Sequence, residues 1–482
     1  MDMRVPMPLE GEKSAIFVEE ARISGFSFIK WLLVAVSFLF CFATPPFQSP
    51  DEPYHFFKAY QISIGHMVSI PGPGGLGYPL PVSIAELSEK KFPLPSESDR
   101  FNYKISDVIA SLQQYDQHEE RAFVKFTNAA PYSPTMYIPQ AAGIFIGRQF
   151  DLPPIALLYL GRIANALAGI LLIVAAINCL PAGKAIMLAV AAMPMTLFQM
   201  GSLSPDATII GLGFMTIALS MRAVLNYSMR AWEMFSLPAV IISLALAKGV
   251  YLPLAIAGLA IKRDRFSKRN IVLVSSIIAG CVLFFAWTIY GGHSGEIETT
   301  VISRKTMLRE VVAKPGAQLA LIVAAPFQFL YVLLSSFAER LPVYIVGIIG
   351  RFGWNTILLP IPVYLLAVAV ILLAAIDSSA SMPRYARGRR LWWLLIVIGL
   401  TALIETALYL SATPLGADYI QGTQGRYFTP FLPLLGFAIL PCSPWLKARF
   451  PYVKTLFPLS VSILVVSGLL VAMNSFWSGG IK

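Results

Sequence analysis

Charge is scarce in this chain of 482 residues, and its scarcity excludes most soluble classes of protein. Charged residues make up 13% of the sequence, about half of the ~25% that is usual in soluble globular domains. The chain also has no Walker A loop, no glycine-rich dinucleotide motif and no H-E-x-x-H sequence. Catalysis on a soluble nucleotide-binding fold is therefore not expected.

Cysteine is equally scarce. The chain has four cysteines, far apart and all in or beside apolar segments: Cys41, Cys179, Cys281 and Cys442. Their spacing fits neither a metal site nor a disulfide framework, so we expect them to pack as small apolar side chains. The sequence thus indicates no cofactor or metal, and it leaves open whether the protein depends on a divalent ion.

Apolar residues are abundant and are gathered in long runs. They make up 56% of the chain, and the mean hydropathy is +0.68. A helix needs about 18–20 apolar residues to cross a bilayer, and the clearest runs near that length are residues 26–44, 155–176, 207–225, 271–290 and 391–410. The fold class that this predicts is an all-α polytopic membrane protein.

The net charge of +11 does not indicate nucleic acid, because the basic residues lie in short clusters between apolar runs. Such clusters are typical of cytoplasmic loops. The two strongest comprise Lys262, Arg263, Arg265, Lys268 and Arg269, and then Arg384, Arg387, Arg389 and Arg390. With the N-terminus also cytoplasmic, they predict about 13 helices, a C-terminus outside, and integration into the cytoplasmic membrane.

Two stretches constrain this count. Residues 318–376 fit one crossing or three equally well. Residues 235–261 must form a short hairpin that turns near Lys248, because basic clusters flank it on both sides.

The predicted organisation has four parts. These are a cytoplasmic arm (1–24), a first transmembrane helix (25–44), an extracytoplasmic loop with juxtamembrane helices (45–154) and a transmembrane helical bundle (155–482). Near the end of the loop, residues 133–148 hold an apolar run too short to span. We expect this run to form a helix that lies in the membrane interface.

The candidate chemistry begins directly after the first helix, at Asp51, Glu52 and His55. A capping box from Ser49 to Glu52 is one interpretation, but it places Pro53 where a backbone N–H is needed. Pro53 fits better at the first helical position, with Glu52 as the cap. The Asp51 carboxylate is then free of the backbone. His55 lies one turn later, where it either orients a carboxylate or sits at the lipid headgroups.

An Asp-Glu pair followed by His after the first membrane helix resembles the first-loop signature of GT-C glycosyltransferases. The chain is more similar still to an uncharacterised prokaryotic family of multi-spanning proteins assigned to that superfamily. The matching residues run through the whole chain: Pro50, Asp51, Glu52, Pro53 and His55; Ala59, Tyr60 and Gln61; Tyr132, Pro134, Tyr137, Ile138 and Pro139; Met193 and Pro194; Gly201, Ser202, Ser204, Pro205 and Asp206; Gly350, Gly353 and Trp354; Gln424, Gly425, Arg426, Tyr427, Phe428 and Pro430.

The resemblance implies a membrane enzyme that uses a sugar carried on a polyprenyl phosphate, with a first-loop aspartate as the base. Glycosyl transfer of this kind needs a base for the acceptor hydroxyl and positive charge for the departing phosphate. Asp51 is the candidate base, Glu52 and His55 are candidate catalytic partners, and inversion is the expected outcome. The acceptor is a glycan, lipid or protein hydroxyl in the cell envelope.

For the phosphate, the predicted topology puts three cations on the outer side: Lys248, Arg351 and Arg426. An arginine suits phosphate because its fork donates two hydrogen bonds, and Gln424 and Tyr427 flank Arg426 as further donor-binding candidates. The alternatives are an interfacial anchor for Arg426 and a snorkelling side chain for Lys248. Arg351 falls in the stretch whose crossings are ambiguous.

Two acidic residues complete the candidate set. Asp206 stands at the outer end of a helix, as a plain cap or as a second carboxylate that steers the acceptor. Glu405 lies inside an apolar helix, where burial is unfavourable without a partner, and it has no assigned role. A polymerase or ligase for pyrophosphate-linked glycans and a flippase for lipid-linked sugars remain as alternative functions.

Overall fold

The computed structural model describes residues 10–92, 103–113, 120–224, 230–259, 268–291, 300–302, 310–312, 314–379, 381–382, 387–440 and 443–477. The predictions for Lys262, Arg263, Arg265, Arg384 and Cys442 lie outside these residues.

Within the described residues, eight helices are long and apolar enough to cross a membrane. They are α1 (Glu10–Ala43, apolar from Gly25), α6 (Pro154–Cys179), α9 (Asp206–Val224), α11 (Lys268–Gly291), α13 (Pro326–Ile349), α14 (Ile361–Ser379), α15 (Arg387–Ala412) and α18 (Val453–Trp477). All five apolar runs singled out in the sequence fall in these helices. The structure thus supports a mostly helical polytopic membrane protein, and the larger number of about 13 crossings stays a prediction.

Several other apolar stretches form broken helices, mostly where proline interrupts the hydrogen-bond ladder. These are α7 (Lys184–Ala191) with α8 (Pro194–Met200), α10 (Ala231–Ala247) with the 3₁₀ helix η3 (Gly249–Gly258), and η4 (Gly425–Phe431) with α16 (Leu432–Ile439). The break between α10 and η3 falls at Lys248, which is the turn predicted for residues 235–261.

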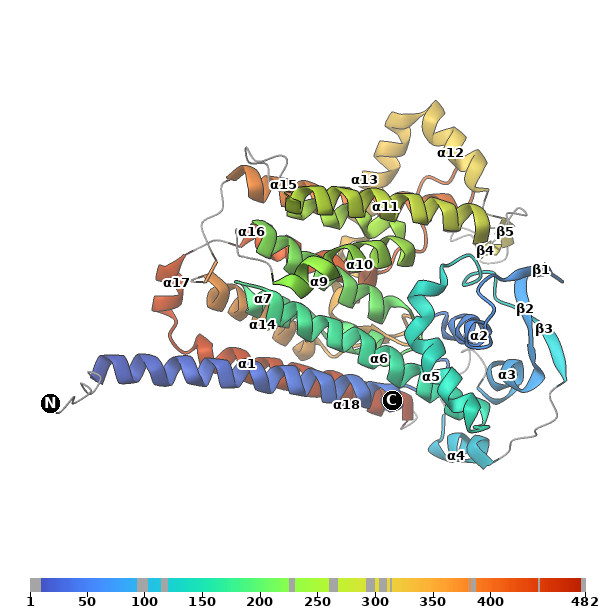
Figure 1. Ribbon diagram of the computed structural model, residues 1–482, viewed down its shortest axis with the longest axis horizontal. Helices are drawn as coiled ribbons and strands as arrows, with labels where there is room; N and C mark the ends of the chain where they lie inside the picture. Colours follow the sequence, from blue (N-terminus) through green and yellow to red (C-terminus); the bar gives the residue numbers. More distant parts are fainter. Residues whose placement is uncertain are drawn as a thin grey trace.

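Residues 318–376, for which the sequence allowed one crossing or three, contain parts or all of three helices of unequal length. A short helix, α12 (Pro315–Ala324), leads directly into α13, and the two make an arch at the top of Figure 1. Pro315 lines the cavity that holds Asp51, and Gly347 near the end of α13 lies against Gly425 in η4 beside that cavity. The arch therefore begins and ends on one side of the bundle, and α14 makes the net crossing.

The two ends of the helical bundle carry different residues. Helices α1 and α18 run side by side and parallel, and the Trp477 indole donates to the carbonyl of Ala43 (2.8 Å). The C-terminal end of α18 therefore lies beside the loop that follows α1, and we call this side the first-loop end. The basic residues Arg222, Arg390 and Lys447 lie at the opposite end, near the ends of α6, α16 and α14.

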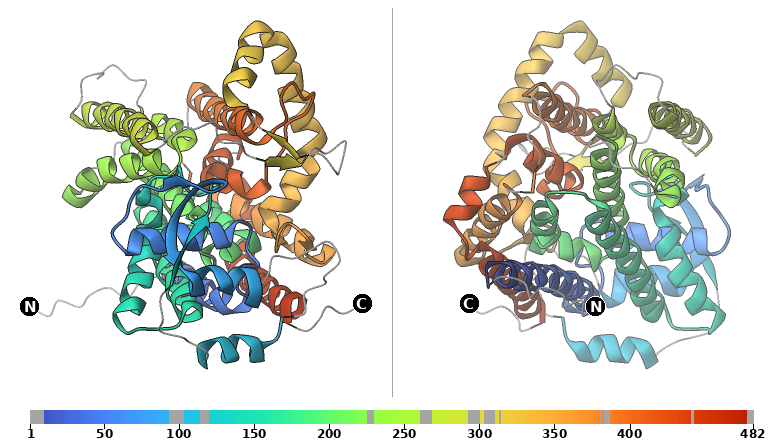
Figure 2. Two further views of the ribbon diagram at one scale, coloured as in Figure 1. Left: turned by 90° about the vertical axis from the view of Figure 1, so that its right-hand side faces the viewer. Right: turned by 60° about the vertical axis from the view of Figure 1, so that its left-hand side comes forward.

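The first loop caps its end of the bundle (Figure 2). Its helices are α2 (Glu52–Ser63), α3 (Val82–Glu86), the π-helical turn η1 (Leu87–Lys91), α4 (Ile105–Gln113), the 3₁₀ turn η2 (Pro134–Tyr137) and α5 (Ile138–Gln149). The predicted short helix before residue 148 is α5, which packs against α2 and α6. The expectation of helices alone was incomplete, because the loop also holds an antiparallel sheet of β1 (Ile70–Gly72), β2 (Gly75–Pro81) and β3 (Arg121–Lys125).

The remaining elements are short. They are the hairpin of β4 (Thr300–Ile302) and β5 (Glu310–Val312), the hairpin of β6 (Arg351–Phe352) and β7 (Ile357–Leu358), and α17 (Pro444–Arg449). The second of these hairpins packs beneath the first loop, where the Trp354 indole donates to the carbonyl of Phe47 (3.1 Å).

Candidate active site at the first-loop end

Asp51 occupies the N-cap position of α2 and leaves its carboxylate free. Its carbonyl accepts the first helical bond from the His55 amide (3.1 Å), but its side chain makes no capping bond. The helix therefore begins one residue earlier than predicted, with Pro53 at its second position rather than its first. Among the described residues, none hydrogen-bonds to the Asp51 carboxylate, and burial raises the pKa of that carboxyl.

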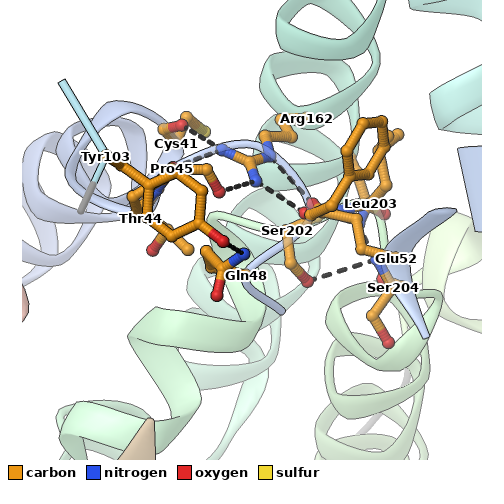
Figure 3. A network of polar contacts seen from close by, with 12 residues as sticks. Cys41, Thr44, Pro45, Gln48, Glu52, Tyr103, Arg162, Ser202, Leu203 and Ser204 are labelled. Atoms are coloured by element: carbon orange, nitrogen blue, oxygen red, sulfur yellow. Dashed lines mark hydrogen bonds and ion pairs between the residues drawn. The ribbon is translucent and has the colours of Figure 1, made fainter. Parts of the chain in front are cut away.

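Glu52 does not join Asp51, contrary to the expectation that both acidic residues face the same site. Its carboxylate is fully buried and points toward α6, where the Arg162 Nε and Nη2 atoms donate to its two oxygens at 2.8 and 2.6 Å. The Leu203 amide donates to it as well (2.9 Å). Figure 3 shows this network. A carboxylate with all of these donors is not available as a base.

Three charged residues from distant parts of the chain meet opposite α2. Asp206 at the start of α9 lies 3.6 Å from the Lys248 Nζ and 3.3 Å from the Arg426 Nε. Each cation also stacks on the Tyr427 ring, at 4.8 Å for Lys248 and 5.4 Å for Arg426. Two cations against one carboxylate leave this group of three with one positive charge, which the ionised Asp51 carboxylate in the same cavity balances. The two cations are the groups that could hold the phosphate of a ligand.

Arg426 retains donor capacity although it is almost completely buried. Its side chain is 3% exposed, and its Nη1 atom has no hydrogen-bond partner within the part of the chain that the structure describes. A buried guanidinium N–H without an acceptor is unfavourable. A ligand oxygen in the adjoining cavity would remove that penalty.

His55 lies one turn after Asp51 and is held by an aromatic hydroxyl. Its Nδ1 is 2.8 Å from the Tyr137 hydroxyl at the end of η2. Burial lowers the pKa of His55 to about 3 and raises that of Tyr137 well above its usual value. Both groups are therefore neutral near pH 7, and His55 offers a hydrogen bond to the site rather than a charge.

These side chains share one cavity of about 380 Å³. Its walls include Asp51, His55, Asp206, Lys248, Arg426 and Tyr427, with Tyr132, Ser204 and Ser411 among the remainder. The cavity is as large as many small-ligand sites. It contains an unpaired carboxylate, a neutral imidazole, two cations and several hydroxyls.

A second, more apolar cavity of about 340 Å³ adjoins the first, and Tyr132, Lys248 and Tyr427 line both. Phe284 and Trp287 of α11 lie on one side of it, and Ile404 and Leu408 of α15 on the other. The outward face of α11 is strongly exposed, as expected for a helix in contact with lipid. A charged pocket and an apolar groove lined by two long apolar helices therefore lie next to each other.

The other predicted residues lie outside these cavities. Gln424 is the N-cap of η4 and lies two residues before Arg426. Arg351 lies in the β6–β7 hairpin and lines neither cavity. Glu405 accepts a hydrogen bond from the Thr423 hydroxyl (2.9 Å), so its buried carboxylate helps to fix the turn before Arg426.

Sequence reasoning missed Arg162 and Tyr251, and it gave Tyr132 as part of the resemblance without a role. Arg162 had a detectable signal, because a lone arginine inside a long apolar run needs a buried partner. Tyr251 donates to the Tyr427 carbonyl (2.8 Å) and so holds η3 against η4. A tyrosine in an apolar helix gives no comparable signal. No group of three or more metal-ligating side chains occurs among the described residues.

Residues 33–435 match the family model described as predicted membrane protein (DUF2142). The chain belongs to this family of predicted membrane proteins. No curated protein matches it. The family description agrees with the eight long apolar helices and establishes a membrane protein without assigning it an activity.

Proposed function

We propose that this protein is a membrane glycosyltransferase of the GT-C type, which moves a sugar from a polyprenyl-phosphate donor to a hydroxyl group. The observation that carries the proposal is the junction of the two cavities. A carboxylate that has no hydrogen-bond partner among the described residues and two cations line a pocket, and an apolar groove adjoins it with several lining residues in common. A donor with a sugar, a phosphate and an isoprenoid chain matches these three environments in order.

In the proposed reaction, the acceptor hydroxyl attacks the anomeric carbon of the sugar. The bond from that carbon to the phosphate oxygen breaks, and Asp51 takes the hydroxyl proton. Lys248 and Arg426 stabilise the negative charge that grows on the departing polyprenyl phosphate. A single displacement with one base inverts the anomeric centre.

The proposed orientation places the first-loop end outside the cytoplasm, because the short basic segments between apolar helices, marked by Arg222, Arg390 and Lys447, lie at the opposite end. Nucleotide sugars are cytoplasmic metabolites, so a site on the outer face needs a sugar already linked to lipid. The groove between α11 and α15 gives such a donor a lateral path from the bilayer. The acceptor hydroxyl then enters from the solvent side, past Thr127 and Asn128 at the cavity wall.

The test uses purified protein in lipid nanodiscs with either a nucleotide sugar or the matching polyprenyl-phosphate sugar. We expect transfer only from the lipid-linked sugar. Asp51→Asn should lower kcat by about 10²- to 10⁴-fold, because the amide keeps the shape of the carboxylate and loses its basicity. Its melting temperature and its affinity for the donor should stay close to wild type. Full activity of Asp51→Asn would rule out the mechanism, and turnover of the nucleotide sugar without lipid would rule out the donor.

A transporter for lipid-linked sugars is the second candidate, favoured by the broken helix at Lys248. Transporters often bind substrate where helices are interrupted. The two functions differ in product, since a transporter moves the lipid-linked sugar between leaflets and leaves its glycosidic bond intact. Vesicles that contain the protein and a labelled donor separate these outcomes without any added acceptor.

A further inference from the structure

The Glu52–Arg162 ion pair has more hydrogen bonds than a contact between two packed helices requires. Both side chains are 0% exposed. The guanidinium donates to the carbonyls of Cys41, Thr44 and Pro45, in addition to both oxygens of Glu52. An arginine has five N–H donors, and every one has an acceptor here. Through the Arg162 side chain, the ion pair connects α6 with the end of α1 and the start of α2.

Both candidate carboxylates are attached to this network. Asp51 is adjacent to Glu52 and has a left-handed backbone (φ 60°), which is unfavourable for a residue with a side chain and needs outside support. On the other side, Glu52 accepts from the amide of Leu203, three residues before Asp206. The segment that leads into α9 is thus tied to the residue that follows Asp51.

One turn along α6, Asn165 completes the arrangement. Its amide donates to the carbonyls of Ser202 and Ser204 (2.8 Å each), and its oxygen accepts from the Thr208 hydroxyl (3.2 Å). A side chain on α6 therefore fixes both flanks of the turn that presents Asp206. Figure 3 shows Glu52 and Arg162 with Ser202 and Ser204 in one network.

We propose that Arg162 and Asn165 are positioning residues, and that α6 sets the separation of Asp51 and Asp206 through them. Arg162 acts on Asp51 through Glu52, and Asn165 acts on Asp206 through the 202–204 backbone. Glu52 is then a structural partner of the candidate base rather than a second base. The inference deepens the proposed function and rests on it only where turnover is concerned.

The first test reads the carboxylates directly, by labelling them with a water-soluble carbodiimide and glycinamide and locating the products by mass spectrometry. Arg162→Lys keeps a positive charge but cannot reach five acceptors. We expect it and Glu52→Gln to raise the labelling rate of Asp51 at least fivefold. Asn165→Ala should raise that of Asp206 more than that of Asp51. If the folded Arg162→Lys and Glu52→Gln proteins both label Asp51 at the wild-type rate, the proposal is wrong.

The chain offers a matched control at the opposite end of the bundle. Arg222 and Glu233 form another ion pair (3.0 Å), with Glu233 buried and Arg222 15% exposed, and neither residue lines a cavity described above. Arg222→Lys and Glu233→Gln should leave the labelling of Asp51 and Asp206 unchanged. Should Arg162→Lys fail to fold, Asn165→Ala decides the question, because equal labelling of Asp206 in that variant and wild type contradicts the proposal.

Turnover gives the second readout. Arg162→Lys should lower kcat at least tenfold and leave the donor KM within about threefold, because Lys248 and Arg426 are held by other elements. Loss of folded protein alone would lower the apparent enzyme concentration and leave the kcat of each folded molecule unchanged. If wild type transfers no sugar while the labelling changes as expected, the proposed function fails and the positioning role stands.

Discussion

At the scale of single residues, the site depends on how each charge is surrounded. Burial raises the pKa of Asp51, Arg426 and Lys248 lower it, and Asp206 raises it again. A base acts only when it is deprotonated, so kcat/KM should rise with pH through a pKa above the usual range of a carboxyl group.

The sign of each neighbour's effect makes the pH dependence testable. Asp206→Asn removes a negative charge near Asp51, so the acid limb of the kcat/KM profile should move to lower pH. Arg426→Gln removes a positive charge, so the limb should move to higher pH. Glu233→Gln is the remote control and should leave it in place. A limb that moves the same way in both site variants would contradict Asp51 as the titrating base.

Arg426 should act mainly on the departing phosphate. Arg426→Ala should raise the donor KM and lower kcat, with a combined loss of about 30- to 1,000-fold in kcat/KM. Arg426→Lys should recover only part of that, because an ammonium restores the charge but not the two-pronged geometry. The measurement is steady-state transfer with a polyprenyl-phosphate sugar. Wild-type kinetics of the Arg426→Ala protein would show that Arg426 does not bind the phosphate.

Sequence alone located the candidate residues better than it located their partners. Asp51, Lys248, Asp206 and Arg426 were each marked by charge in an apolar chain, and the structure brings all four to one cavity. Their separation along the chain gave no indication of which would pair. The opposite environments of the neighbours Asp51 and Glu52 were also hidden, because they depend on Arg162, 110 residues away.

At the scale of elements, the site depends on how closely α9 approaches α6. Gly169 of α6 has no room for a side chain, because a Cβ there would lie 2.9 Å from the Ala207 carbonyl oxygen. That contact lies one residue after Asp206. The close packing of these two helices therefore sets how deeply the start of α9 enters the bundle.

Two glycine substitutions in long helices should have different effects on stability. Gly169→Ala should lower the stability by about 1–3 kcal/mol through overpacking. Gly399→Ala in α15 meets nothing within 4 Å and should be neutral or stabilising by up to about 1 kcal/mol, since alanine favours a helix. Thermal melts in one detergent compare the two variants. A Gly169→Ala protein as stable as Gly399→Ala would show that the helices are not in close contact there.

The sequence predicted the helices correctly where the runs of apolar residues are long. It did not predict the elements whose backbone is irregular. The first-loop sheet was missed because its strands run through Pro71, Gly72 and Gly75, which are typical of turns. The break at Lys248 was found through charge placement, not through helix propensity. The arch of α12 and α13 could not be anticipated, because a long apolar helix that returns to its starting side has the composition of one that crosses.

At the scale of the whole molecule, the structure fixes which segments share a side of the membrane without fixing which side it is. The first loop, the turn before η4 and the end of α18 all lie at one end, and α17 and the start of α15 at the other. Positively charged loops favour the cytoplasm. Relative placement and absolute orientation are therefore separate claims that one labelling experiment can distinguish.

Single cysteines in a background without the four native ones should report both claims. A membrane-impermeant maleimide added outside intact cells should label Ser106→Cys in the first loop and Asp418→Cys before η4. It should not label Gly388→Cys in α15 or Ala448→Cys in α17 until the membrane is opened. Labelling of Ser106→Cys and Gly388→Cys from one side would contradict the fold. A complete reversal of the labelling would be compatible with the fold but would place Asp51 in the cytoplasm. Nucleotide sugars are available there, so the argument for a lipid-linked donor would no longer hold.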